Sequence, residues 1–120
     1  NEDSESNILA GFFVATNGLG WKKNDGWTDS TDFCNFYGVE CDEAGRVTKI
    51  DLLDNGLQGT TPSSIFKLPQ LNELLLSKND ISFSFVGIGD AETLVTLYLD
   101  NTNLDSVENI GDAPNLITLH

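Results

Sequence analysis

The chain has 120 residues, of which 39% are hydrophobic and 21% charged; this suffices for one domain with a modest core and argues against disorder. Its net charge is −13, from 19 acidic and 6 basic residues spread along the sequence, and such a surface repels nucleic acid and anionic membranes. No apolar run approaches the ~18 residues of a membrane span, so we expect no direct membrane insertion of this segment.

Residues 4–17 are predicted to form a helix. Apolar residues recur there at helical spacing and would turn one face towards a core. A serine can cap the start, and Asn17-Gly18 can end the helix because both residues tolerate positive φ. The apolar stripe consists of Ile8, Leu9, Phe12, Phe13 and Ala15.

The stretch 18–46 is predicted to be irregular and rich in aromatic side chains, with a tight turn at 42–45 leading into a strand. It contains the only two cysteines, Cys34 and Cys41, whose closeness fits one local disulfide formed in an oxidising compartment. The alternatives are two reduced thiols or half of a zinc site. Zinc would need two further ligands, and the only histidine is His120, at the far end.

From Val47 onward the sequence repeats itself. Related segments begin at Val47, Leu71, Leu94 and Leu116, so the spacings are 24, 23 and 22 residues. The first three segments have apolar residues at the first, fourth and sixth places, and the last two of these places alternate as in a short strand with one buried face. A period of this length predicts a solenoid of stacked units.

The ninth place of each repeat carries a polar residue: Asn55, Asn79 and Thr102. We expect its side chain to bond the backbone of the turn that leaves the strand, where ladder hydrogen bonds run out. Thr102 has a shorter side chain that makes fewer such bonds, so a looser third turn is predicted.

These segments resemble the leucine-rich-repeat (LRR) family. The strings GWKKNDGW (20–27), CNFYGVEC (34–41) and GRVTKIDL (45–52) are similar to the cysteine-containing N-terminal cap of secreted and receptor-type members in plants and protists. The string LQGTTPSSIFKLPQL (57–71) is similar to the plant-type repeat. Two positions depart from the family pattern: Phe36 stands where the cap has tryptophan, and Thr61 where the repeat has isoleucine.

The resemblance implies an α/β fold, a right-handed LRR solenoid with a parallel β-sheet on the concave face and an α-helical, disulfide-bonded cap. The expected cap covers 1–46. The expected repeats cover 47–120, divided into 47–70, 71–93, 94–115 and a truncated repeat from 116. Because the chain stops early in that repeat, we expect it to be a fragment of a longer protein.

In this fold the side chains between the buried leucines point out from the concave face. There the repeats would form an apolar diagonal that includes a tyrosine and has an acidic rim. Such a patch suits a protein or peptide partner bearing Arg or Lys; the alternative is that scattered apolar residues have no role. The candidate partner-binding residues are Asp51, Leu53, Glu73, Leu75, Tyr98, Asp100 and His120.

Catalysis finds little support, because no nucleophile has an identifiable base beside it. We find no calcium loop, and Gly87 and Gly89 lack the context of a phosphate loop, so no metal or cofactor is expected. We therefore expect an extracellular, non-catalytic recognition module. The alternative is a structural or scaffolding subunit packed in a larger extracellular or luminal assembly, and a weaker one is a protease inhibitor or binder of cell-wall polysaccharide.

Overall fold

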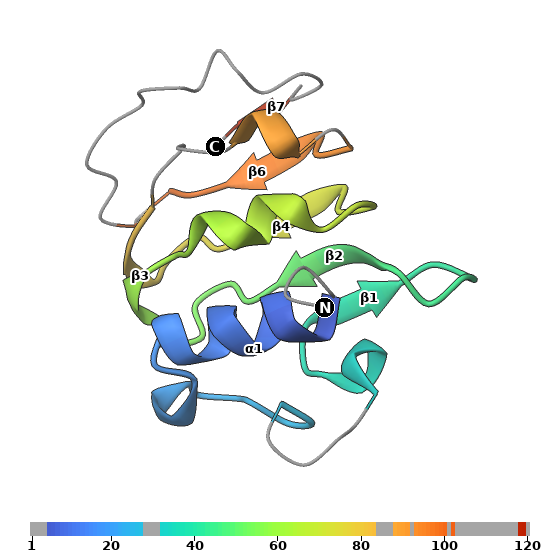
Figure 1. Cartoon of the computed structure of the whole chain (residues 1–120). Coiled ribbons are helices and arrows are strands. Elements are labelled where there is room, and N and C mark those ends of the chain that lie inside the picture. Colours follow the sequence, from blue (N-terminus) through green and yellow to red (C-terminus); the bar gives the residue numbers. More distant parts are fainter. Residues whose placement is uncertain are drawn as a thin grey trace.

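The computed structural model describes residues 5–27, 32–83, 88–91, 93–100 and 102, together with the backbone of 118–119. One α-helix, α1 (Glu5–Ala15), precedes a series of short strands and 3₁₀ helices (Figure 1). The remaining elements are η1 (Gly18–Gly20), η2 (Phe33–Asn35), β1 (Val39–Cys41), β2 (Val47–Asp51), β3 (Gln58–Thr60), η3 (Ser63–Lys67), β4 (Glu73–Leu75), β5 (Asp80–Ser82), η4 (Ile88–Asp90), β6 (Thr96–Tyr98) and β7 (Thr118–Leu119).

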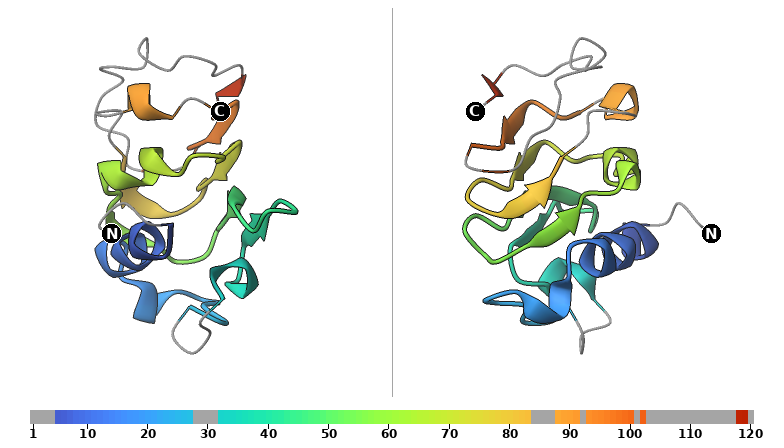
Figure 2. Two further views of the ribbon diagram at one scale, coloured as in Figure 1. Left: turned by 45° about the vertical axis from the view of Figure 1, so that its right-hand side comes forward. Right: turned by 90° about the vertical axis from the view of Figure 1, so that its left-hand side faces the viewer.

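The main sheet has the strand order β1-β2-β4-β6-β7. Its strands β2, β4, β6 and β7 are parallel, and β1 runs antiparallel to β2 at the N-terminal end. The first two repeats leave the main sheet and pass through η3 and η4 on the opposite side, and in the right-hand view of Figure 2 the cap helix α1 lies in one row with η3 and η4. The described repeats therefore stack strand upon strand and helix upon helix.

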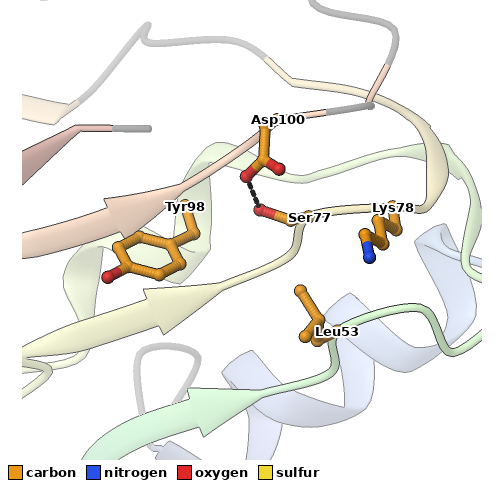
Figure 3. Close-up of a pocket in the computed structure, with 5 residues that line it drawn as sticks. All are labelled: Leu53, Ser77, Lys78, Tyr98 and Asp100. Atoms are coloured by element: carbon orange, nitrogen blue, oxygen red, sulfur yellow. Dashed lines mark hydrogen bonds between the residues drawn. The ribbon is translucent and has the colours of Figure 1, made fainter.

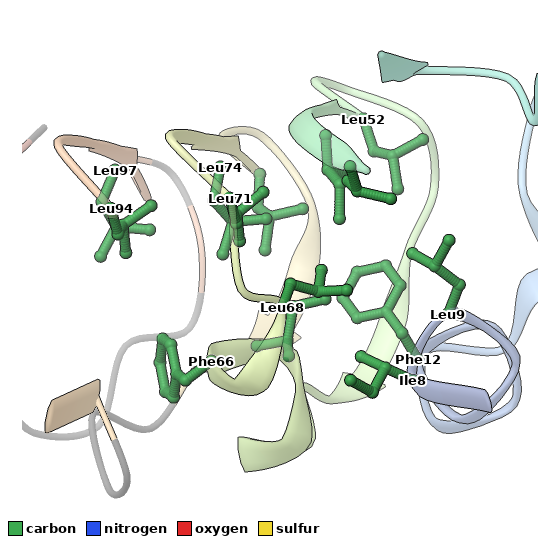
Figure 4. Packing of buried hydrophobic residues seen from close by; sticks show 14 of the residues in the cluster. Ile8, Leu9, Phe12, Leu52, Phe66, Leu68, Leu71, Leu74, Leu94 and Leu97 are labelled. Atoms are coloured by element: carbon green, nitrogen blue, oxygen red, sulfur yellow. The ribbon is translucent and has the colours of Figure 1, made fainter. Parts of the chain in front are cut away.

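The leucines at the fourth place of each repeat share one interior, as the sequence predicts. Ile50 pairs in register with Leu74, and Leu74 with Leu97. All three side chains are fully buried in the same apolar cluster, which Figure 4 shows extending from α1 through the repeats. Burying one such side chain contributes about 1.5–3 kcal/mol, so this column stabilises the stack strongly.

The polar residue at the ninth place bonds the backbone, as predicted. The Asn79 amide donates to the carbonyl oxygens of Leu52 and Leu76 at 2.8 and 2.9 Å, and its side-chain oxygen accepts from the backbone N–H groups of Asn55 and Leu57. The Thr102 hydroxyl donates to the Leu99 carbonyl at 2.7 Å. The predicted looser third turn lies outside the described residues.

Asn55 uses the same chemistry to attach the cap to the first repeat. Its side chain accepts from the backbone N–H of Lys23 at 2.9 Å and donates to the Lys23 carbonyl at 2.8 Å. The Glu5 carboxylate provides a second point of attachment, because it accepts a hydrogen bond from the N–H of Val47 at the start of β2. Both ends of the cap helix region are thus fixed to the solenoid.

Aromatic side chains fill the cap between α1 and the loop that follows it. Phe12 and Trp21 pack edge to face. The ring centroids of Trp27 and Phe36 lie 4.8 Å apart, and Phe36 is the residue that stands where the family pattern has tryptophan. Each indole N–H also has an acceptor, since Trp21 donates to the carbonyl of Thr16 and Trp27 to that of Tyr37. The cap therefore seals the first repeat with rings whose polar atoms are satisfied.

Cys34 and Cys41 are joined by a disulfide, which confirms the predicted bond and shows that the reduced-thiol and zinc alternatives are wrong. The stretch 18–46 is less irregular than expected, because it contains β1, which includes Cys41. The turn after Cys41 joins β1 to β2 in an antiparallel hairpin. The small parallel sheet of β3 and β5 was likewise not predicted. Three-residue strands carry too short an alternation to stand out in a sequence.

Candidate functional site

The candidate residues that the structure describes lie on or just beyond the strands of the main sheet, on the face turned away from the apolar core. Asp51, Leu75 and Tyr98 occupy neighbouring positions on β2, β4 and β6 and are each half-buried. A second column follows just beyond the strand ends and consists of Leu53, Ser77 and Asp100. Backbone hydrogen bonds align it, because the N–H of Asp54 donates to the Ser77 carbonyl and the N–H of Lys78 donates to the Asp100 carbonyl. The repeat period therefore brings side chains from three separate segments to one surface.

A hollow of about 520 Å³ lies between the two columns. Leu53 forms one wall and is 47% exposed, and the Tyr98 ring lies towards the other side (Figure 3). Between them the Ser77 hydroxyl donates a hydrogen bond to the Asp100 carboxylate. We call this the sheet-face hollow; its lining residues are Leu53, Ser77, Lys78, Tyr98 and Asp100.

Two lining residues were not among the candidates. Ser77 lies at a position where the repeat pattern predicts an outward side chain, but it is 1% exposed, with Asp100 hydrogen-bonded over its hydroxyl. The sequence carries no signal for this cover, since it arises from a residue one repeat away. Lys78 has φ 63°, a left-handed conformation that directs the chain out of the strand, and it stands beside the hollow as a positive charge.

A row of alternating charge lies on the other side of the Asp51–Leu75–Tyr98 column. Glu40 on β1 pairs in register with Lys49, and Lys49 with Glu73. The Lys49 ammonium lies 3.7 Å from the carboxylate of Glu40, which is not among the candidate residues. The acidic candidates are Asp51, Glu73 and Asp100. His120 lies outside the described residues.

The described part of the chain offers no group of three His, Cys, Asp or Glu side chains arranged to hold a metal ion. Every buried side-chain nitrogen or oxygen atom in that part has a hydrogen-bond partner. No described helix has the length and apolar character needed to span a bilayer. The sheet face offers apolar contact from Leu53, the Tyr98 ring and charged groups of both signs.

The chain is similar to curated plant receptors. It is 34% identical over 82 residues to the receptor-like kinase TMK4 of Arabidopsis thaliana, covering 68% of this chain and 9% of that protein. It is 35% identical over 103 residues to the phytosulfokine receptor 1 of the same plant, covering 81% of this chain and 10% of the receptor. The chain therefore spans about a tenth of the length of these relatives. No family model matches it.

Solved structures show the same fold. The ectodomain of BIR2 from Arabidopsis thaliana superposes with a TM-score of 0.78 at 27% identity, covering 92% of this chain and 62% of that one. The Arabidopsis receptor kinase HAESA, solved with the peptide hormone IDA and the co-receptor SERK1, gives 0.78 at 28% identity over 100% of this chain and 21% of that one.

The stacked parallel strands, the disulfide-bonded cap and these similarities define the class: the chain belongs to the leucine-rich-repeat family. Within the family it is of the secreted and receptor type, with a cysteine-containing N-terminal cap like those of the plant receptors. The disulfide and the receptor relatives make it an extracellular chain.

Proposed function

We propose that the chain is an extracellular recognition module whose sheet face binds a protein or peptide bearing Arg or Lys, and that it acts without catalysis. The sheet-face hollow carries the proposal. It offers an apolar wall from Leu53, the Tyr98 ring and the Asp100 carboxylate within one depression. An aromatic side chain on a rigid strand beside charged groups is the composition found at the energetic centre of protein interfaces.

A cationic partner is supported by the balance of charge. The chain carries −13 overall, so its field attracts a positive partner and accelerates encounter. Asp51, Glu73 and Asp100 lie around the apolar residues, and Lys49 and Lys78 limit the surface that a cation can approach. The HAESA complex with IDA and SERK1 supports a peptide or protein ligand in this class, although HAESA is much longer than this chain.

The finer architecture in this proposal follows the family pattern. We take the solenoid to be right-handed, with the main sheet on its concave face, so that the hollow lies on the inside of the curve. We take 1–46 as the cap and 47–70, 71–93, 94–115 and a repeat from 116 as the repeating part. Under this division Asp51 and Leu53, Glu73 and Leu75, and Tyr98 and Asp100 come from three successive repeats.

A display selection tests the proposal and does not require an identified partner. Random peptides are selected against the 120-residue chain, and the affinities of the enriched peptides are measured for wild type, Tyr98→Ala and Asp100→Asn. We expect Arg or Lys next to an apolar residue in the enriched peptides, and about 1–3 kcal/mol weaker binding to Tyr98→Ala. Glu43→Gln, in the exposed hairpin turn, is the matched charge control and should bind like wild type.

Two outcomes of the selection would contradict the proposal. Peptides that bind all four proteins equally, or an enrichment without cationic residues, would refute the assignment of the sheet face. The scaffolding alternative predicts that result, because a subunit packed in an assembly makes its contacts on the flanks and the helical side.

A further inference from the structure

A second surface, away from the sheet-face hollow, stands out by its lack of charge. One residue in five of this chain is charged, yet the two longest uncharged runs are 6–21 and 55–66. The first run contains most of α1 and all of η1, and the second contains β3 and most of η3. They belong to different parts of the sequence, the cap and the first repeat.

The fold places these two runs side by side. The N–H of Gln58 donates to the carbonyl of Thr16 at 3.1 Å, and the backbone of Gly59 passes so close that an added Cβ would lie 2.5 Å from the Ala15 carbonyl. Helices α1 and η3 also pack against each other. We call the joint surface the neutral flank; its exposed residues include Ala10, Gly11, Val14, Leu19, Gln58 and Thr60.

The neutral flank has an apolar centre with both a ridge and a hollow. Val14 and Leu19 are 78% and 79% exposed, more than the other large apolar side chains in the described part of the chain. Together with Phe13, Asn17 and Gly18 they line a hollow of about 210 Å³, which is enough for one aliphatic side chain. Ala10 and Gly11 on the exposed face of α1 leave room for another backbone to approach.

We propose that the neutral flank is a two-fold contact between two copies of this chain. A partner of the same net charge, −13, can dock only where its contact avoids like-charge repulsion, and the neutral flank meets that condition. An isologous contact must also be self-complementary. Here Val14 or Leu19 of one copy fits the hollow beside the same residues of the other copy. The remaining repulsion between the two chains is screened over about 8 Å at physiological salt.

This contact has a distinctive dependence on salt. Its own residues are uncharged, and the acidic residue in register with them, Asp80, lies beside Gln58 at the edge of the flank. Because the like net charges of the two chains repel, added salt should tighten the contact. Binding of a cationic partner to the sheet face should weaken under the same change, because that attraction is screened. The two surfaces can therefore be distinguished in one buffer series.

Sedimentation equilibrium of the 120-residue chain tests the proposal, from about 5 μM to about 1 mM at about 0.05 and 0.5 M salt. We expect the average mass to rise from 13.1 kDa towards twice that value, with tighter association at the higher salt. Val14→Asp and Leu19→Asp should each weaken association at least about tenfold, and circular dichroism would verify that they fold. Leu53→Asp adds the same charge at an exposed leucine of the sheet face and should dimerise like wild type.

Three results would overturn the proposal: a monomer at every concentration, a dimer that persists in both flank variants, or a dimer lost equally in Leu53→Asp. A monomer that instead co-floats with neutral phosphatidylcholine vesicles through Val14 and Leu19 would assign the flank to a lipid surface.

Discussion

Replacing Asn79 with alanine should strongly destabilise the chain. The side chain is 3% exposed, and its oxygen accepts from the N–H groups of Asn55 and Leu57 at 2.9 and 3.1 Å. Asn55 and Leu57 are themselves buried, so neither N–H can turn to water in the variant. Each buried donor without an acceptor costs about 1–3 kcal/mol.

The lost amide adds a smaller cost, because the carbonyls of Leu52 and Leu76 would lose a donor from the Asn79 side chain. Together these terms predict a loss of about 3–6 kcal/mol in the free energy of unfolding, a large share of the typical 5–15 kcal/mol for a domain. Asn79→Thr should lose less, since a threonine hydroxyl can still donate to one carbonyl, as that of Thr102 does to Leu99.

Urea unfolding followed by tryptophan fluorescence and by far-UV circular dichroism measures this difference. The tryptophans Trp21 and Trp27 report on the cap, and circular dichroism reports on the whole chain. Asn72→Ala is the matched control, because Asn72 is exposed and its amide makes one bond of 3.3 Å to Thr93; it should change stability by less than about 0.5 kcal/mol. A loss below about 1 kcal/mol for Asn79→Ala would refute the reasoning about the buried turn.

Three further variants test the cap. Gly18→Ala should lower the free energy of unfolding by about 1–3 kcal/mol, because its Cβ would lie 2.2 Å from the Phe13 ring. Gly11→Ala, at an exposed helix position with open space around it, should raise that free energy by up to about 1 kcal/mol. Equal effects of the two variants in thermal melts would contradict this. Removal of the Cys34–Cys41 disulfide by a double alanine substitution should cost about 2 kcal/mol, and reduction of the wild type should raise its intact mass by two hydrogens; an unchanged mass would contradict the disulfide.

The leucine period predicted the parallel stack because it encodes one buried position on each successive strand. Ile50, Leu74 and Leu97 have the same role in successive repeats, and a regular period of this length is the sequence signature of a solenoid, which brings such residues into one interior. The apolar stripe of α1 was equally informative, since Ile8, Leu9 and Phe12 are buried as the helical spacing requires. In both cases the pattern is long and repeats itself.

The parts that the sequence did not reveal depend on contacts between distant residues. Asn17 ends the helix with φ 57° as expected, but Gly18 is required for space beside Phe13 and not for positive φ. Ser77 has the sequence position of an outward residue, yet it is buried and its hydroxyl is hydrogen-bonded to Asp100, 23 residues along the chain. The strands β1, β3 and β5 are three residues long, so their partners and not their sequence define them.

The register of the main sheet is the claim on which the stacked solenoid and the sheet-face hollow depend. Nuclear magnetic resonance of the chain with labelled isoleucine and leucine methyl groups tests it directly through nuclear Overhauser effects. The structure predicts contacts that join Ile50 to Leu74 and Leu74 to Leu97, since these pairs lie opposite each other on adjacent strands. A pattern in which the Leu74 methyl groups contact neither Ile50 nor Leu97 would contradict the stacked solenoid and the site built on it.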